Sequence, residues 1–495
     1  MGRPNLLFIL SDQHAQRFAG CYGNGFGLTP NLDRLAARGV VFDRAYCPSP
    51  ICLPSRASLL TGKHPHRHRC WTNSDALPSD EPTYAHALGA AGYRPELIGR
   101  MHFVGPDQLH GFVARPIGDH NSNWLGVSGV GHGIFQGTAG PDAISVVRSG
   151  AGRAAYEIKD EHTTEVALRR LDEIAAERAA GDQSPFCLTV GLMLPHPPYV
   201  VNDEDFDALP EAIEEPEIAA VPAGSDHPWL RWWRDRSGAA GLSTADQRRA
   251  RRAYAALVRK MDRLIGQILD RLEAAGLADD TLVVYSSDHG DHAGDRGLWW
   301  KHTFYDESAR IPLIMAWPGV LPAGERRQQV ANLVDLPPTF AEALGGEALP
   351  DIDGRSLLAV AKDGATPWCD ETFSEYCTDT SFDFAHGEYA IQRMLLRGRY
   401  KYVYYHGFPD QLFDLETDPL EQHDLSGDPR LAGVRLAMRA ATLAGWSPAA
   451  IHHTLAEREA RKALWAKWGE QVRPADTHRW SVPADEELRL RGFPG

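Results

Sequence analysis

A cysteine stands at the start of a short predicted helix, in the segment Cys52-Leu53-Pro54-Ser55-Arg56. Pro54 has the fixed φ that suits a first helical turn, and Gly62 provides a stop signal for the helix. Free amides at a helix start attract anions, and Arg56 adds a planar, permanent positive charge that suits tetrahedral oxyanions. The segment therefore predicts a nucleophile beside an anion-binding surface.

Two other interpretations of Cys52 fit the sequence less well. A buried structural thiol is the commonest fate of a lone cysteine, but Pro50 and Pro54 prevent this stretch from pairing as a core strand. A phosphatase-type thiolate requires an arginine at the position that Ser58 occupies. Nucleophilic chemistry at Cys52 is the better interpretation.

Two aspartates follow apolar runs that predict buried parallel strands. Asp12 follows the run 6–10, and Asp288 with His289 follows the run 282–287. Singly, an aspartate is more often a cap or turn residue, but open α/β sheets place their sites at the carboxyl ends of strands. Two carboxylates and an imidazole suit a mainly oxygen-ligated, redox-inert cation such as calcium. The combination with the cysteine indicates a single site.

Strand and helix patterns alternate over roughly the first 370 residues, which predicts an α/β fold with a mostly parallel sheet between helices. A third apolar run, 186–192, leads into Pro195-His196-Pro197. Residues 244–275 keep the three-and-four apolar spacing of an amphipathic helix that covers the sheet. His196 is therefore expected at the same sheet edge as the two aspartates.

The chain of 495 residues exceeds the size at which one core stops growing, so a large domain at 1–370 and a smaller one at 371–495 are predicted. The smaller part is expected to hold a small antiparallel sheet, a polar helix at 448–468 and a tail. Its predicted strands are 389–396, 401–405 and 410–415. Two segments without periodicity, 117–153 and 223–241, are expected to be long loops above the site.

The net charge and the cysteines indicate which binding partners and which cellular compartment suit the chain. A formal charge of −15 argues against nonspecific binding to nucleic acid or to anionic membranes. Seven scattered cysteines without a C-x-x-C pair suggest reduced thiols in a cytoplasm, and neither a disulfide framework nor a thiolate zinc site. The apolar run 5–10 is too short for a signal peptide, and no later run has the length of a membrane span.

The stretch from Cys52 to Gly62 fits the signature C-x-P-S-R-x-x-x-x-T-G at every fixed position. In this respect the chain resembles the formylglycine-dependent sulfatases of the alkaline phosphatase superfamily. The resemblance implies an alkaline-phosphatase-like fold with a small C-terminal antiparallel-sheet subdomain. It also implies that a maturation enzyme oxidises Cys52 to an aldehyde. Other similar segments are 4–13, 29–36, 92–102, 287–290, 400–402 and 412–415, and 102–112 is most similar to choline-sulfatase-like members.

The resemblance implies one divalent cation held by Asp12, Cys52, Asp288 and His289. Gln13 stands where many relatives have a second aspartate, and its amide oxygen is retained as a further ligand without charge. His289 stands where others have asparagine, so manganese is an alternative to calcium, and magnesium a third choice.

The catalytic positions carried over from the family are Cys52, Arg56, Arg100, His102, His196 and Lys301. Arg56, His102, His196 and Lys301 match positions that hold the sulfate, assist turnover of the aldehyde and protonate the leaving oxygen. Arg100 departs from the usual lysine but keeps its charge. In the implied reaction the aldehyde hydrate attacks sulfur, and removal of a proton from its second hydroxyl, by His102, expels sulfate.

The expected activity is hydrolysis of a small-molecule sulfate ester to inorganic sulfate and an alcohol. One alternative is a phosphonate monoester or phosphodiester hydrolase with the same formylglycine site, and another is a catalytically silent sulfate-ester-binding protein. Five tryptophans could stack on a sugar or enclose a quaternary ammonium, so choline is one candidate alcohol. The tail at 475–495 is expected to pack on a neighbouring subunit and form a homo-oligomer.

Overall fold

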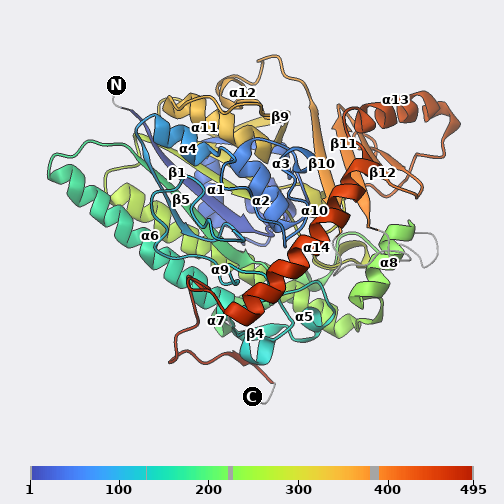
Figure 1. The fold of residues 1–495 in the computed structure, drawn as a ribbon, viewed down its shortest axis with the longest axis horizontal. Helices are drawn as coiled ribbons and strands as arrows, with labels where there is room; N and C mark the ends of the chain where they lie inside the picture. The colour runs from blue at the N-terminus through green and yellow to red at the C-terminus, as the bar shows by residue number, and fades with distance from the viewer. Residues whose placement is uncertain (1–2, 130, 221–226, 379–388, 493–495) are drawn as a thin grey trace.

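The computed structural model describes residues 3–129, 131–220, 227–378 and 389–492 (Figure 1). In the described residues a central seven-stranded sheet has the order β3-β5-β1-β7-β8-β2-β9. Neighbouring strands are parallel except at β8, which is antiparallel to β7 and β2. The predicted mostly parallel α/β fold is confirmed. The strands are β1 (Asn5–Asp12), β2 (Val40–Tyr46), β3 (Arg94–Gly99), β5 (Phe186–Pro195), β7 (Thr281–Ser287), β8 (Leu313–Ala316) and β9 (Glu325–Asn332).

The strand β1 lies between β5 and β7 and is buried along its whole length. Its run of Leu, Phe and Ile side chains suits a strand that is covered on both faces. The parallel register pairs Asp12 with Pro195 and Ser11 with Ser287. Asp12, His196 and Asp288 therefore leave the sheet at the same edge, as the three apolar runs predicted.

Helices cover both faces of the sheet (Figure 1). On one face, α11 (Leu336–Leu344) places Phe340 against Phe8, with ring centroids 5.3 Å apart. On the other face Tyr285 donates to Met261 Sδ of α9 at 3.7 Å. The long helix at 244–275 is confirmed as α9 (Thr244–Ala274). Other helices are α1 (Pro30–Ala37), α2 (Cys52–Thr61), α3 (Pro65–His68), α4 (Tyr84–Ala90), α6 (Ala155–Ala179), α7 (Asp203–Asp207), α10 (Asp306–Ala309) and α12 (Leu358–Lys362).

A four-stranded antiparallel sheet follows, as the C-terminal pattern predicted. It buries Leu395, Tyr402 and Leu412 beneath the two last helices. The first strand of this sheet was not predicted, and the division of the chain at residue 370 stays a prediction. The elements are β10 (Glu371–Cys377), β11 (Ile391–Arg397), β12 (Tyr400–Tyr405), β13 (Gln411–Asp414), α13 (Ala432–Leu443) and α14 (Pro448–Val472).

The two expected loops contain regular structure. The segment 117–153 includes α5 (Ile144–Val147) and β4 (Gly150–Arg153). The expectation of a loop over 223–241 was wrong where the structure describes it, from residue 227, because α8 (Pro228–Ser237) occupies that stretch. Proline at its start and a left-handed Gly238 at its end frame this helix, and residues 223–226 lie outside the described residues.

The described part of the tail packs on its own chain. There β14 (Arg489–Leu490) pairs with β4, which also pairs with β6 (Val200–Val201). Arg491 forms ion pairs with Asp203 and Asp207. None of the helices in the described ranges combines the length and the apolar character that crossing a membrane requires.

Candidate active site

The helix α2 begins at Cys52 and ends before Gly62, as its sequence predicted. Ile51 is extended, with φ −156°, and accepts the first helical hydrogen bond from Ser55 N at 3.2 Å. Gly62 takes the left-handed conformation at φ 72° that favours glycine. Every residue of α2 is buried, so packing on all sides fixes the position of the cysteine.

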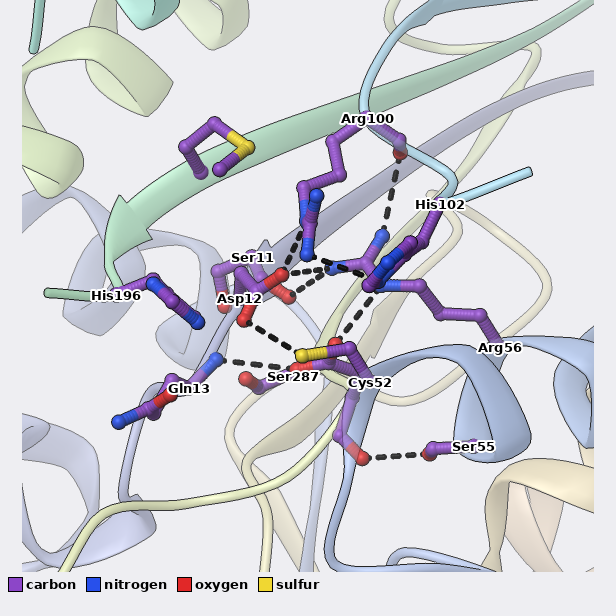
Figure 2. Close-up of polar contacts among 12 residues, drawn as sticks. Ser11, Asp12, Gln13, Cys52, Ser55, Arg56, Arg100, His102, His196 and Ser287 are labelled. Carbon is purple, nitrogen blue, oxygen red and sulfur yellow. Dashed lines mark hydrogen bonds and ion pairs between the residues drawn. The ribbon is translucent and has the colours of Figure 1, made fainter. Parts of the chain in front are cut away.

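Four potential metal ligands gather at the sheet edge (Figure 2). Asp12, Cys52, Asp288 and His289 each offer one ligand atom, and these atoms lie within 4.8 Å of one another. Cys52 Sγ lies 3.7 Å from Asp12 Oδ1 and 3.3 Å from His289 Nε2. The structure therefore brings together four of the five residues predicted to hold a cation, and its donor set of two carboxylates and an imidazole fits a hard divalent ion.

Asp12 is ionised although it is fully buried. Burial and the neighbouring Cys52 raise its pKa, but Arg100, His196 and Arg56 outweigh them and bring the pKa of Asp12 to about 2. A carboxylate that stays negative at neutral pH can serve as a cation ligand without first losing a proton.

Gln13, the fifth predicted ligand, lies beside the cluster with a left-handed backbone at φ 69°. Its Oε1 accepts from Lys301 Nζ at 2.8 Å, and its Nε2 donates to Asp291 Oδ2 at 2.6 Å. The same oxygen of Asp291 accepts from the Tyr199 hydroxyl at 2.7 Å. Gln13 therefore orients Lys301 through its amide oxygen, and its role as a metal ligand stays a prediction.

Lys301 reaches the cysteine directly. Its Nζ lies 3.0 Å from Cys52 Sγ. Burial raises the pKa of the Cys52 thiol, but Lys301 and His289 more than compensate and hold that pKa well below its ordinary value. In the unmodified chain the thiolate is therefore favoured, and the same positive charge would face an anionic group bound at this position.

Arg56 lies against the carboxylates and does not face open space. It donates from Nε to Asp288 Oδ2 at 2.8 Å, from Nη2 to Asp12 Oδ2 at 3.1 Å and from Nη1 to the Arg100 carbonyl at 3.2 Å. All three of its nitrogens are thus engaged by the chain itself. These contacts let Arg56 fix the two carboxylates, and its predicted catalytic role beside the sulfate stays a prediction.

Arg100 and His102 form a second layer above Asp12. Arg100 Nε pairs with Asp12, and Nη2 donates to His102 Nδ1 at 3.0 Å. Because arginine cannot accept, the neutral imidazole carries its hydrogen on Nε2. Burial and the charge of Arg100 lower the pKa of His102. Asp119 supports both residues, since it accepts from His102 N at 3.0 Å and lies 3.6 Å from Arg100 Nη1.

His196 follows β5 and lies beside Asp12 and Gln13 in Figure 2. Its Nδ1 donates to the Pro197 carbonyl at 2.7 Å, which leaves Nε2 for proton transfer. A cavity of about 190 Å³ opens in front of it. Besides Gln13, His196 and Lys301, its lining includes Ile51, Thr72, Asn73, Pro141, Trp300, His302, Tyr376 and Cys377.

Several residues of the site have no sequence signal that identifies them. Asn73 accepts from Leu53 N at 2.9 Å, beside the cysteine, and Tyr376 of β10 forms part of the cavity wall. Asp119 lies within the segment that was expected to be a loop. Asp291 is the exception. It lies three positions after Asp288, close to the motif at the end of the predicted strand, and could have been identified from the sequence.

Comparisons with known proteins cover most of the chain. The Sulfatase family model matches residues 4–346, and the model of the N-sulphoglucosamine sulphohydrolase C-terminal region matches residues 294–444. A choline-sulfatase of Rhizobium meliloti is 35% identical over 478 residues, which cover 93% of this chain and 90% of that protein. The multifunctional alkaline phosphatase superfamily protein PehA of Trinickia caryophylli is 31% identical and covers 88% of this chain and 93% of its own length.

Solved structures share the fold. The phosphonate monoester hydrolase SpPMH from Silicibacter pomeroyi superposes with a TM-score of 0.72 at 25% identity, covering 90% of this chain and 95% of that one. The phosphonate monoester hydrolase of Agrobacterium radiobacter gives the same TM-score at 24% identity, with coverage of 89% and 95%.

Proposed function

This chain belongs to the sulfatase family and hydrolyses sulfate esters, and we propose that it does so with a formylglycine made from Cys52 beside one divalent cation. The observation that carries the proposal is the convergence of Asp12, Cys52, Asp288 and His289 within 4.8 Å. A few apolar side chains could fill this buried space and stabilise the fold equally well. The four ligand-type side chains, gathered around the cysteine of the maturation signature, therefore indicate a chemical role.

The formylglycine and the divalent cation supply complementary chemistry. A formylglycine at position 52 would supply, as its hydrate, an oxygen nucleophile for sulfur and a second hydroxyl whose deprotonation expels the sulfate and restores the aldehyde. A cation held by Asp12, Asp288 and His289 supplies positive charge for oxyanions. Calcium is the first choice for this set, manganese is the alternative because His289 contributes nitrogen, and magnesium is a third choice.

The chain's own residues move the protons. Lys301 Nζ, 3.0 Å from Sγ in the unmodified chain, donates to the oxygen that leaves sulfur. As the imidazolium, His196 protonates that oxygen through Nε2 while its Nδ1 donates to the Pro197 carbonyl. His102 removes the proton of the second hydroxyl, which requires Nε2 to be free of hydrogen, so Arg100 must release Nδ1 and the ring hydrogen must lie there during this step.

Local charge explains how a chain of net charge −15 attracts an anionic ester. Around position 52 the cationic side chains Arg56, Arg100 and Lys301 face the carboxylates Asp12 and Asp288. A divalent cation adds two further positive charges. The site is therefore positive in total, and it focuses the field on the cavity.

We propose a small alcohol as the leaving group, because the cavity has a volume of only about 190 Å³. Choline is one candidate, supported by the similarity to the choline-sulfatase of Rhizobium meliloti. A competing activity is hydrolysis of phosphonate monoesters or phosphodiesters, since two neighbours of the same fold are phosphonate monoester hydrolases. A silent sulfate-ester-binding protein is the third reading.

Hydrolysis of matched aryl esters separates these functions. Matured, metal-replete protein is expected to cleave an aryl sulfate at least about tenfold faster, in kcat/KM, than the corresponding aryl phosphodiester, a difference of about 1.4 kcal/mol in barrier. Faster phosphodiester cleavage would favour the alternative hydrolase. Stoichiometric binding of the aryl sulfate without any turnover would favour the silent binder.

Arg100→Lys should change substrate preference while activity remains measurable. The shorter ammonium cannot pair with Asp12 and donate to His102 at once, so the charge beside the ester moves. The ratio of sulfate to phosphodiester turnover is expected to change by roughly 3- to 10-fold, the range for the net contribution of one hydrogen bond. Unchanged kinetics with both esters would mean that Arg100 does not influence the bound ester.

The proposal also includes a maturation partner, a cellular location and an oligomeric state. A formylglycine-generating maturation enzyme is the partner that Cys52 requires. The seven cysteines are free thiols in the structure, which supports a cytoplasmic location. A homo-oligomer formed through the C-terminal tail remains a proposal, although the described tail packs on its own chain.

A further inference from the structure

The last helix and the tail contact loops of the site although they lie beyond the family models. The matched models end at residue 444, whereas α14 spans Pro448–Val472 and the described tail continues to residue 492. In Figure 1, α14 crosses the molecule from the small sheet towards the edge of the large domain. Nothing in the family match assigns a task to this segment.

The first contact is with the loop 71–75. Lys462 Nζ of α14 lies 2.8 Å from Asp75 Oδ1 and donates to Thr72 Oγ1 at 2.9 Å. Asp75 is only 2% exposed, and Arg458, one helical turn before Lys462, lies 3.4 Å from the same oxygen. Two cations of α14 therefore hold one buried carboxylate of the loop.

The loop transmits this contact to Cys52. The other oxygen of Asp75 accepts from Trp71 N at 2.8 Å and Thr72 N at 2.9 Å, which closes the turn. The turn directs Asn73 to α2, where its Oδ1 accepts from Leu53 N at 2.9 Å. Leu53 directly follows Cys52, and Asn73 also lines the cavity. One chain of contacts thus joins α14 to the residue beside the nucleophile.

The tail holds a second loop of the site, at residues 118–123. Asn123 N donates to the Thr477 carbonyl at 2.9 Å, and Gly118 N donates to the Arg479 carbonyl at 3.3 Å. A side chain at Gly118 would overlap Arg479, whose Cβ would lie 2.4 Å away. The segment between these two anchors carries Asp119, which supports Arg100 and His102. The tail therefore fixes the layer above Asp12.

We propose that residues 448–492 form an intramolecular brace of the active site, in which Lys462 and Asp75 are positioning residues for Cys52. Only the expected effect on turnover rests on the proposed function. The brace itself is defined by the contacts described above. It assigns the segment a role in turnover in addition to any role in assembly.

Lys462→Met tests the brace, with Lys467→Met as its matched control on the exposed side of the same helix. The Lys462 variant should lower kcat for an aryl sulfate by about tenfold, with a smaller effect on KM, because the loop supplies only a small part of the cavity wall while its Asn73 contacts Leu53 beside the nucleophile. Lys462→Arg should recover most of the activity, since arginine can still pair with Asp75. Lys467→Met should match the wild type.

Hydrogen exchange gives a readout that does not depend on activity. Peptides that cover 71–75 and the start of α2 should exchange at least about tenfold faster in Lys462→Met, and at the wild-type rate in Lys467→Met. Wild-type exchange and kinetics in Lys462→Met would overturn the brace. Absence of sulfatase activity in the wild type would instead overturn the proposed function, and the exchange result would still decide the brace.

Discussion

Cys52→Ala is expected to abolish sulfate release, with a loss of roughly 10⁴- to 10⁶-fold in kcat, the range for removal of a covalent nucleophile. The reason is that Cys52 is the only residue of the cluster that can become the aldehyde. Wild-type protein made with an active maturation system should show, in the peptide spanning Cys52, the mass loss of thiol-to-aldehyde conversion and should react with carbonyl reagents. The variant should show neither.

Cys369→Ala is the matched control, because Cys369 is an exposed thiol outside the site. It should keep both the aldehyde and the activity. Counting the turnovers of unmodified protein tests the mechanism itself. A sulfated thiol at position 52 has no second hydroxyl with which to eliminate sulfate, so unmodified protein should be sulfated at most once. Multiple turnovers by protein shown to carry only the free thiol would refute the proposed mechanism.

Removal of the cation, or of one of its proposed ligands, has the second largest expected effect. Chelated protein should lose activity by about 10³-fold or more and regain it with calcium or manganese, whichever the His289-containing set prefers. Asp288→Asn should lose activity to a similar extent in the presence of the ion. The isosteric amide keeps the shape of the buried side chain but brings no charge.

Thermal unfolding checks the same assignment without activity. A cation at about 100 times its Kd should stabilise the wild type by about 2.7 kcal/mol and raise its unfolding midpoint. The midpoint of Asp288→Asn should not respond to the ion, while that of Asp279→Asn, an exposed aspartate before β7, should respond like the wild type. Turnover by a metal-free sample, or an equal response in Asp288→Asn, would remove Asp288 from the ligand set.

The sheet could be predicted from the sequence because strands buried on both faces read as uninterrupted apolar runs. This is why β1, β5 and β7 were located within a few residues, and with them the edge at which Asp12 and Asp288 meet. The helix α8 was missed although its proline start and glycine end were readable and Trp229, Leu230 and Trp233 lie on one buried face, because charged residues alternate with them over a short segment. Capping signals would have been the better guide there.

The direction of a side chain could not be predicted in the same way. The motif named Arg56 as a charge beside Cys52, but only the folded chain shows that Asp12 and Asp288 occupy its guanidinium. Asn73 and Lys462 are similar cases. They are ordinary polar residues with no motif around them: Asn73 accepts from Leu53 N of α2, and Lys462 donates to Thr72 from a helix almost 400 positions later in the chain. Contacts of this sequence separation leave no local pattern.

Cys52 is 1% exposed and sits in a helix whose every residue is buried. If Cys52 is converted as proposed, the oxidising enzyme must reach a thiol that the folded chain covers, so conversion and folding would compete for the same chain. Once α2 has packed, only local or global unfolding exposes the cysteine again. The fraction of active molecules is therefore decided during synthesis, by the rate of oxidation relative to the rate of folding. Slower folding at low temperature, or more maturation enzyme, should raise that fraction, whereas treating the folded thiol form afterwards should not.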